Sequence, residues 1–251
     1  FPYTTLFRSP STPGNEVPGA IAYVDPNFKM PQVWRSNVNA EFQLPYGFML
    51  SVGAMYTRDI YNVVQKNMNE KAPSGTYNEQ PGRVYWTKNN YYDNPKTKTV
   101  IQLTNGDEKG YQYSFNAVLT KKFDFGFTGS FGYTYTMAKD MTANPGSSAA
   151  SVWQNNVAVN SLNDPGVSYS LFSTPHRLIA NASYEVAYAN MKTTVSLFYT
   201  GYQQGRFSYT YSNDMNGDGN YSDLMYVPAS KEEMTFVDIK DKQNNVTYSA
   251  V

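Results

Sequence analysis

Cysteine is absent from the 251 residues, and His176 is the only histidine. The absence of cysteine excludes disulfides and thiolate sites, and one histidine cannot build a histidine cluster. No Ser/Asp spacing around His176 suggests a catalytic triad, so we interpret it as a polar residue at a loop-to-strand junction. Glu232 and Glu233 are adjacent and would point apart in a strand. No constellation of residues therefore indicates an enzyme.

Long apolar runs and an excess of charge are missing as well. No stretch of 18 apolar residues occurs, which excludes a membrane-spanning helix but leaves strands that cross a membrane possible. Lys and Arg together number 20, and Asp and Glu together also number 20. This balance gives no electrostatic case for binding nucleic acid.

A long alternating segment, Gly110–Asp140, is the most informative part of the chain. From Phe125 to Met137, every second position holds an aromatic residue or methionine, except for Gly129, and the positions between them hold Gly, Ser or Thr. A period of two predicts β-strand, because successive side chains point to opposite faces. About 9–11 alternating residues with aromatics near both ends is the length that a tilted strand needs to cross a membrane.

The same alternation recurs along the chain and predicts six long strands. Their expected ranges are Gln32–Gln43, Phe48–Val64, Gly110–Lys122, Phe125–Asp140, Pro175–Tyr188 and Met191–Tyr211. Between them we expect a loop at Pro10–Pro31, a polar connection at Gln65–Glu108 and another at Thr142–Thr174. Within the first polar connection, Arg83–Thr87 and Thr97–Leu103 are predicted to form a short hairpin.

The connections between these strands alternate between short and long. Leu44–Gly47, Phe123–Gly126 and Tyr188–Met191 are tight turns, whereas the other connections run for tens of residues. Outer-membrane barrels have short periplasmic turns and long extracellular loops. We therefore predict an all-β fold, an antiparallel meander of about six long strands that forms part of a transmembrane β-barrel, incomplete and not closed. Its Phe/Tyr face would contact lipid, and its Ser/Thr/Asn face would line the lumen.

An Asp- and Asn-rich segment provides the sharpest local signal. Oxygen-bearing side chains at every second position, followed by glycine, resemble the start of a Ca²⁺ loop. The candidate ligands are Asp214, Asn216, Asp218, Asn220 and Asp223. The acidic residue that an EF-hand has at position twelve is replaced by Met225. The alternative is a turn rich in Asx and Gly residues that binds no metal.

Four aromatic residues in the connections are candidates for stacking against a sugar or peptide ligand. They are Trp86, Trp153, Tyr209 and Tyr211. Packing within the loops is the alternative role for these side chains.

The first nine residues have a different character from the rest. Phe1–Ser9 reads as the translation of a common sequencing-library adapter, so we expect this segment to be an artefact. Residues 10–251 are then expected to be a partial barrel, truncated at both ends.

Three segments carry a resemblance to a known family. Val24–Arg35, Ser173–Ala180 and Ser196–Pro228 resemble parts of the barrel of TonB-dependent receptors. The resemblance is to the large Bacteroidota receptors that carry a carboxypeptidase-regulatory-like domain, and it covers most of residues 19–237. It consists of many weak matches in order.

That resemblance implies a function and a set of partners. It implies an outer-membrane location, active import of a solute captured by extracellular loops, a plug domain and further strands in the whole protein, and energy supplied through TonB. Two alternatives remain open from the residues alone. One is a soluble β-sandwich or lectin-like binding module, and the other is a passive porin-like barrel.

Overall fold

The computed structural model describes residues 20–78, 80, 82–87, 90–92, 99–234 and 238–248. Six long strands dominate it: β2 (Gln32–Leu44), β3 (Phe48–Tyr61), β8 (Tyr111–Lys122), β9 (Phe127–Asp140), β11 (His176–Tyr188) and β12 (Met191–Tyr202). They form one antiparallel sheet in the order β12-β11-β9-β8-β3-β2, with the two-residue strand β10 (Ser168–Tyr169) paired to β9. The sheet does not close on itself, which confirms the predicted open meander.

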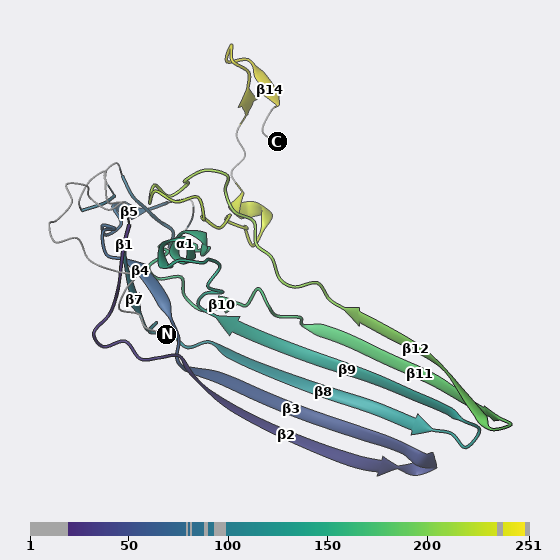
Figure 1. Ribbon diagram of the computed structural model, residues 1–251. Helices are drawn as coiled ribbons and strands as arrows, with labels where there is room; N and C mark the ends of the chain where they lie inside the picture. The colour runs from purple at the N-terminus through teal and green to yellow at the C-terminus, as the bar shows by residue number, and fades with distance from the viewer. Residues whose placement is uncertain are drawn as a thin grey trace.

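The long sheet extends away from the other segments as a curved blade (Figure 1). The three tight turns lie together at its far end. Tyr46 and Gly47 in the first turn, Gly126 in the second and Ala189 in the third have positive φ angles, which allow the chain to reverse within a few residues. The long connections gather at the opposite end, so the asymmetry predicted from the connection lengths is confirmed.

The strand register places the two kinds of side chain on opposite faces. One continuous row across the sheet joins Phe42, Leu50, Leu119, Phe131, Ala180 and Tyr199. A neighbouring row on the other face joins Gln43, Met49, Thr120, Ser130, Asn181 and Phe198. The apolar face is open to its surroundings: Val38 and Leu197 expose 72 % and 71 % of their surface. None of the described residues forms a second layer over this face.

Short elements make up the remainder of the chain. They are β1 (Ala20–Val24), η1 (Pro45–Gly47), β4 (Val64–Asn67), β5 (Gly75–Thr76), β6 (Val84–Tyr85), β7 (Thr99–Thr104), α1 (Ala149–Asn155), η2 (Lys231–Glu233), β13 (Ile239–Lys240) and β14 (Val246–Tyr248). The β13–β14 hairpin projects away from the rest in Figure 1. None of the helices found in the described residues is long and apolar enough to cross a membrane.

Two of the predicted long strands end earlier than expected. The second ends at Tyr61 instead of Val64, and the sixth ends at Tyr202 instead of Tyr211. The last ladder contacts of β12 are made to Arg177 and to the His176 carbonyl, and the preceding Pro175 has no N–H to extend the ladder. Beyond Tyr202 the chain leaves the six-stranded sheet, and Thr210 forms an isolated bridge with Leu224.

The predicted hairpin between Arg83–Thr87 and Thr97–Leu103 is wrong. β6 pairs with β5. β7 instead lies between two other strands, antiparallel to β4 and parallel to β1. This arrangement buries Ile101 completely and leaves Val64 only 2 % exposed, so distant apolar partners prevail over the local pairing. The expected loop at Pro10–Pro31 is also wrong at Ala20–Val24, which forms β1. Residues 1–19, with the proposed adapter segment Phe1–Ser9, lie outside the described part, as does Thr97.

Candidate functional site

The long connections fold into a compact structure at one end of the sheet, which we call the loop layer (the described residues among 62–110, 141–175 and 203–234). Its apolar centre contains Ile101, Trp153, Ala158 and Leu162, all at most 3 % exposed. Helix α1 contacts β4 and β7 and supplies Trp153. The helix begins with a capping box in which the Ser148 hydroxyl accepts a hydrogen bond from the Ser151 amide.

The Asp-rich turn 214–223 lies inside this layer. Asn216, Asp218, Asn220 and Asp223 are 1–6 % exposed. The turn uses most of its own oxygens: both carboxylate oxygens of Asp214 accept backbone amides, from Gly217 and Gly219, and Asp223 Oδ2 accepts the amide of Met215. The Asp218 carboxylate accepts the amide of Asn220 at 2.7 Å. Gly217 and Gly219 have positive φ angles, which explains glycine at these two places.

Glu70, from the loop after β4, approaches the same turn. It is 8 % exposed, its Oε1 atom accepts a hydrogen bond from Ser161, and its Oε2 atom has no partner among the described residues. Glu70 pairs through its backbone with Tyr91, whose hydroxyl donates to the Asp218 carbonyl at 3.2 Å. Glu70 and Asp218 are therefore neighbouring buried carboxyls from segments nearly 150 residues apart.

Burial and nearby negative charges raise the pKa of both groups. Burial, followed by the negative charge of Asp218, raises the pKa of Glu70 to about 8. Burial raises the pKa of Asp218 to about 6, although the hydrogen bond from the Asn220 amide opposes the shift. Burial also raises the pKa of Asp223. Within the described residues, no three Asp, Glu, His or Cys side chains converge as metal ligands.

The four aromatic candidates divide into two pairs. Trp153 is 1 % and Trp86 is 6 % exposed, and their indole nitrogens donate to Asn163 and to the Lys71 carbonyl. Both fit the alternative role of loop packing. Tyr209 is 67 % exposed, whereas Tyr211 is partly exposed and has the Arg83 guanidinium over its ring, so Tyr209 is the more accessible of the two.

Arg83, which the sequence did not single out, holds the turn from the side. It is 2 % exposed, lies 5.5 Å from the centre of the Tyr211 ring and donates to the Leu224 carbonyl. Its positive charge opposes the rise in the pKa of Asp223. No local pattern marks Arg83 or Glu70, because both reach the turn from a distant connection.

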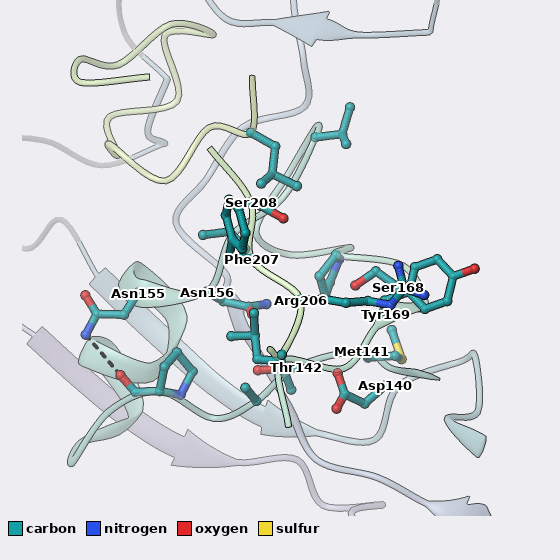
Figure 2. Close-up of a pocket in the computed structure, with 18 of the residues that line it drawn as sticks. Asp140, Met141, Thr142, Asn155, Asn156, Ser168, Tyr169, Arg206, Phe207 and Ser208 are labelled. Carbon is teal, nitrogen blue, oxygen red and sulfur yellow. Dashed lines mark hydrogen bonds between the residues drawn. The ribbon is translucent and has the colours of Figure 1, made fainter. Parts of the chain in front are cut away.

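A cavity of about 610 Å³ opens between α1, β10 and the segment after β12. Figure 2 shows Asn155 and Asn156 on one side of it and Tyr169 and Arg206 on the other. Asn155 is held in place by a hydrogen bond to the Pro145 carbonyl at 3.1 Å, which the figure marks with a dashed line. Phe207 and Leu171 add apolar walls. A volume of this size, with mixed polar and apolar walls, can hold a small solute.

Comparison with known proteins identifies one related family. A family model described as "Outer membrane beta barrel domain" matches residues 1–215, which is 215 of the 251 residues. The comparisons with curated proteins and with solved structures each returned no match.

Proposed function

Because the chain belongs to the family of outer membrane β-barrel domains, we propose that it is part of a TonB-dependent receptor that actively imports a solute. The family places the chain in the bacterial outer membrane, in contact with lipid. Import and TonB coupling are supported by the barrel segments Val24–Arg35, Ser173–Ala180 and Ser196–Pro228, which resemble those receptors of Bacteroidota. They are also supported by a loop layer that is folded and contains a cavity.

One observation carries the proposal: the sheet is open at both edges and bare on its apolar face. The backbone groups along the outer edges of β2 and β12 have no partner strand among the described residues. In hydrocarbon each unpaired group costs several kcal/mol, so further strands must complete the barrel. We propose that these strands, and a plug domain in the lumen, belong to a longer polypeptide of which this chain is a part.

The exposed face argues against the soluble sandwich alternative. A sandwich requires a second sheet packed against the apolar rows, about 10 Å away. The described residues place no such layer there, and Val195, Leu197 and Tyr199 expose 58–71 % of their surface. We propose that lipid covers this face, that the Ser/Thr/Asn face lines the lumen, and that the loop layer lies outside the cell.

Binding to TonB distinguishes an energised importer from a passive porin. The complete protein containing this chain is immobilised, and the purified periplasmic domain of TonB is passed over it. We expect saturable binding that is lost when the N-terminal TonB-contacting segment of the complete protein is removed. A complete protein with no plug and no TonB binding would be a passive barrel, and the importer proposal would be abandoned.

Calcium remains a proposal for the turn 214–223. Its support is the alternating oxygen-bearing side chains of the turn and the buried Glu70 beside it, whose Oε2 atom has no partner among the described residues. In the complete protein, added Ca²⁺ should raise the melting temperature. Asp218→Ala should abolish that rise, whereas Asp164→Ala, at an exposed loop position, should preserve it. A calcium response that survives Asp218→Ala would show that the ion binds elsewhere.

A further inference from the structure

The loop-layer end of the apolar face carries an unusual row of side chains, which we call the rim row. Backbone pairing aligns Trp34 with Arg58, Arg58 with Tyr111, Tyr111 with Lys139 and Lys139 with Tyr169. Arg206 joins the row from the segment after β12, because its guanidinium lies 3.7 Å from the centre of the Tyr169 ring. Three cations thus alternate with three aromatic rings across one rim of the sheet.

At the level of the rim row, basic and acidic residues of the strands lie on opposite faces of the sheet. Asp59 and Asp140 follow Arg58 and Lys139 directly in sequence, so they point to the opposite face. The two ion pairs found in the described residues are Lys66–Asp107 and Lys192–Glu185. The three cations of the rim row therefore have no acidic partner in the part of the chain that the structure describes.

The rim row differs from ordinary side-chain behaviour at a membrane interface. At the tight-turn end of the sheet, the apolar face carries Lys121. Its ammonium lies 4.6 Å and 4.4 Å from the ring centres of Phe48 and Phe123. A single lysine that extends along aromatic rings toward water is common at such a boundary. Three unpaired cations in one row are better suited to a bound anion.

Tyr169 contacts two of the three cations of the rim row. Lys139 Nζ lies 5.0 Å from the centre of its ring, and the Arg206 guanidinium lies closer still. Figure 2 shows Tyr169 and Arg206 next to each other among the residues that line the cavity. A planar guanidinium can donate two parallel hydrogen bonds to phosphate, and its stacking on a ring holds it ready to do so.

We propose that the rim row binds the phosphate groups of the anionic glycolipid that forms the outer leaflet of the outer membrane. The inference rests on the proposed orientation, in which the loop layer lies outside the cell. Only in that orientation does the row lie in the leaflet that the glycolipid forms, with its acyl chains beside the apolar face and its phosphates level with the row. The aromatic rings then lie at the boundary where their apolar bodies and polar edges are both satisfied.

The test compares three variants of the complete protein in a neutral detergent. The first removes the charges (Arg58→Gln, Lys139→Gln and Arg206→Gln together). The second removes two cations from the opposite face of the same sheet (Arg35→Gln and Arg177→Gln). The third keeps every charge but changes its shape (Arg58→Lys, Lys139→Arg and Arg206→Lys). Each is titrated with bisphosphorylated lipid A and with the same glycolipid lacking phosphate, and binding is read by native mass spectrometry.

A basic residue near an anionic membrane surface contributes about a fivefold gain in binding, so the charge-removal variant should lose about 100-fold affinity for lipid A. The opposite-face variant should bind within about twofold of the parent, and the charge-conserving variant should bind far more tightly than the charge-removal variant. Glycolipid without phosphate should bind the parent as weakly as lipid A binds the charge-removal variant. Equal binding of lipid A by the charge-removal variant and the parent would overturn the proposal, as would displacement of lipid A by millimolar inorganic phosphate.

A separate measurement tests the orientation on which this inference rests. The chain has no cysteine, so Asp164→Cys in the loop layer and Asp124→Cys in a tight turn each introduce a unique thiol into it. A membrane-impermeant maleimide should label the first and not the second on intact cells. The reverse pattern would refute the orientation, and with it the proposed role of the loops, whatever the lipid titration shows.

Discussion

The six-stranded sheet and the loop layer bury their side chains in opposite ways. Among the described residues that are at most 9 % exposed, Thr57 alone lies in a long strand. The remaining buried side chains, including Trp153, Ile101 and Asp218, belong to the loop layer and the segments that join it to the sheet. In a soluble protein the regular elements supply the core and the loops lie at the surface. This chain reverses that relation.

The reversal shows where each region obtains its stability. The sheet has complete ladders between neighbouring strands but no apolar partner of its own, so its apolar face must be covered by something outside the chain, which lipid provides. The loop layer has its own apolar centre and its own network of hydrogen bonds. Mutations should therefore act on the two regions by different physical routes, and the predictions below test that separation.

The largest effect is expected in the apolar centre of the loop layer. Trp153→Ala should destabilise the layer by about 3–5 kcal/mol, because it removes a fully buried indole and leaves a cavity. Limited proteolysis of the detergent-solubilised complete protein should cut within residues 141–175 much faster than in the parent. Trp34→Ala is the matched control, since Trp34 is 54 % exposed on the sheet. If both variants are cut equally fast, the loop layer is not held by an apolar centre of its own.

The second-largest loss of stability is expected in the sheet, and its size should depend on which face carries the substitution. Ala117 and Asn116 are neighbours in the middle of β8 and point to opposite faces. Ala117→Arg should cost about 2–4 kcal/mol, because it places a charge against lipid near the bilayer midplane. Asn116→Arg should lower the free energy of unfolding much less if the face that carries Asn116 contacts water. Urea unfolding from lipid vesicles measures both, and the opposite ranking would exchange the lipid and lumen faces.

Protonation of Glu70 should affect the stability of the loop layer. The pKa of Glu70 is raised to about 8 in the folded protein, above its value in the unfolded chain. The folded state then holds a proton that the unfolded state releases, so the stability of the layer should fall as pH rises from about 4.5 to about 8. One proton gives a slope of at most about 1.4 kcal/mol per pH unit.

Thermal unfolding in EDTA across this pH range measures that slope, with protease resistance of the loop layer as the readout. Glu70→Gln should flatten the curve, because the amide does not titrate there. In that variant the stability of the loop layer should still depend on pH, more weakly and between about pH 4 and 6, because the pKa of Asp218 is raised to about 6. A variant with an unchanged slope above pH 6 would show that Glu70 is not the group responsible.

The same contrast explains how much could be predicted from the sequence. The ends of β2 and β8 were predicted to within a residue, because alternation and tight turns are local signals. The loop layer could not be predicted, since its contacts join residues such as Glu70 and Asp218 that are far apart in sequence. The pairing of β7 with β1 and β4 was missed for that reason.

One element of the loop layer, helix α1, does have a signal in its local sequence. Helix α1 was missed, although Ser148 and Ser151 form a capping box directly before and within its first turn. The Asp-rich turn was recognised from its spacing, and the structure shows that its oxygens are taken largely by the turn's own amides. The partners that distinguish a calcium loop from a simple turn come from other segments.

The smallest effect tests whether α1 depends on that local signal or on its packing. Ser148→Ala removes the side chain that accepts the Ser151 amide, which should cost about 1 kcal/mol. A helix of seven residues is marginal in isolation, so most of its stability must come from the burial of Val152 and Trp153. Hydrogen exchange of the α1 amides should therefore rise modestly in Ser148→Ala and far more in Trp153→Ala. If the two variants exchange equally fast, the cap and not the apolar centre holds the helix, and the loop layer would owe its order to local sequence as the sheet does.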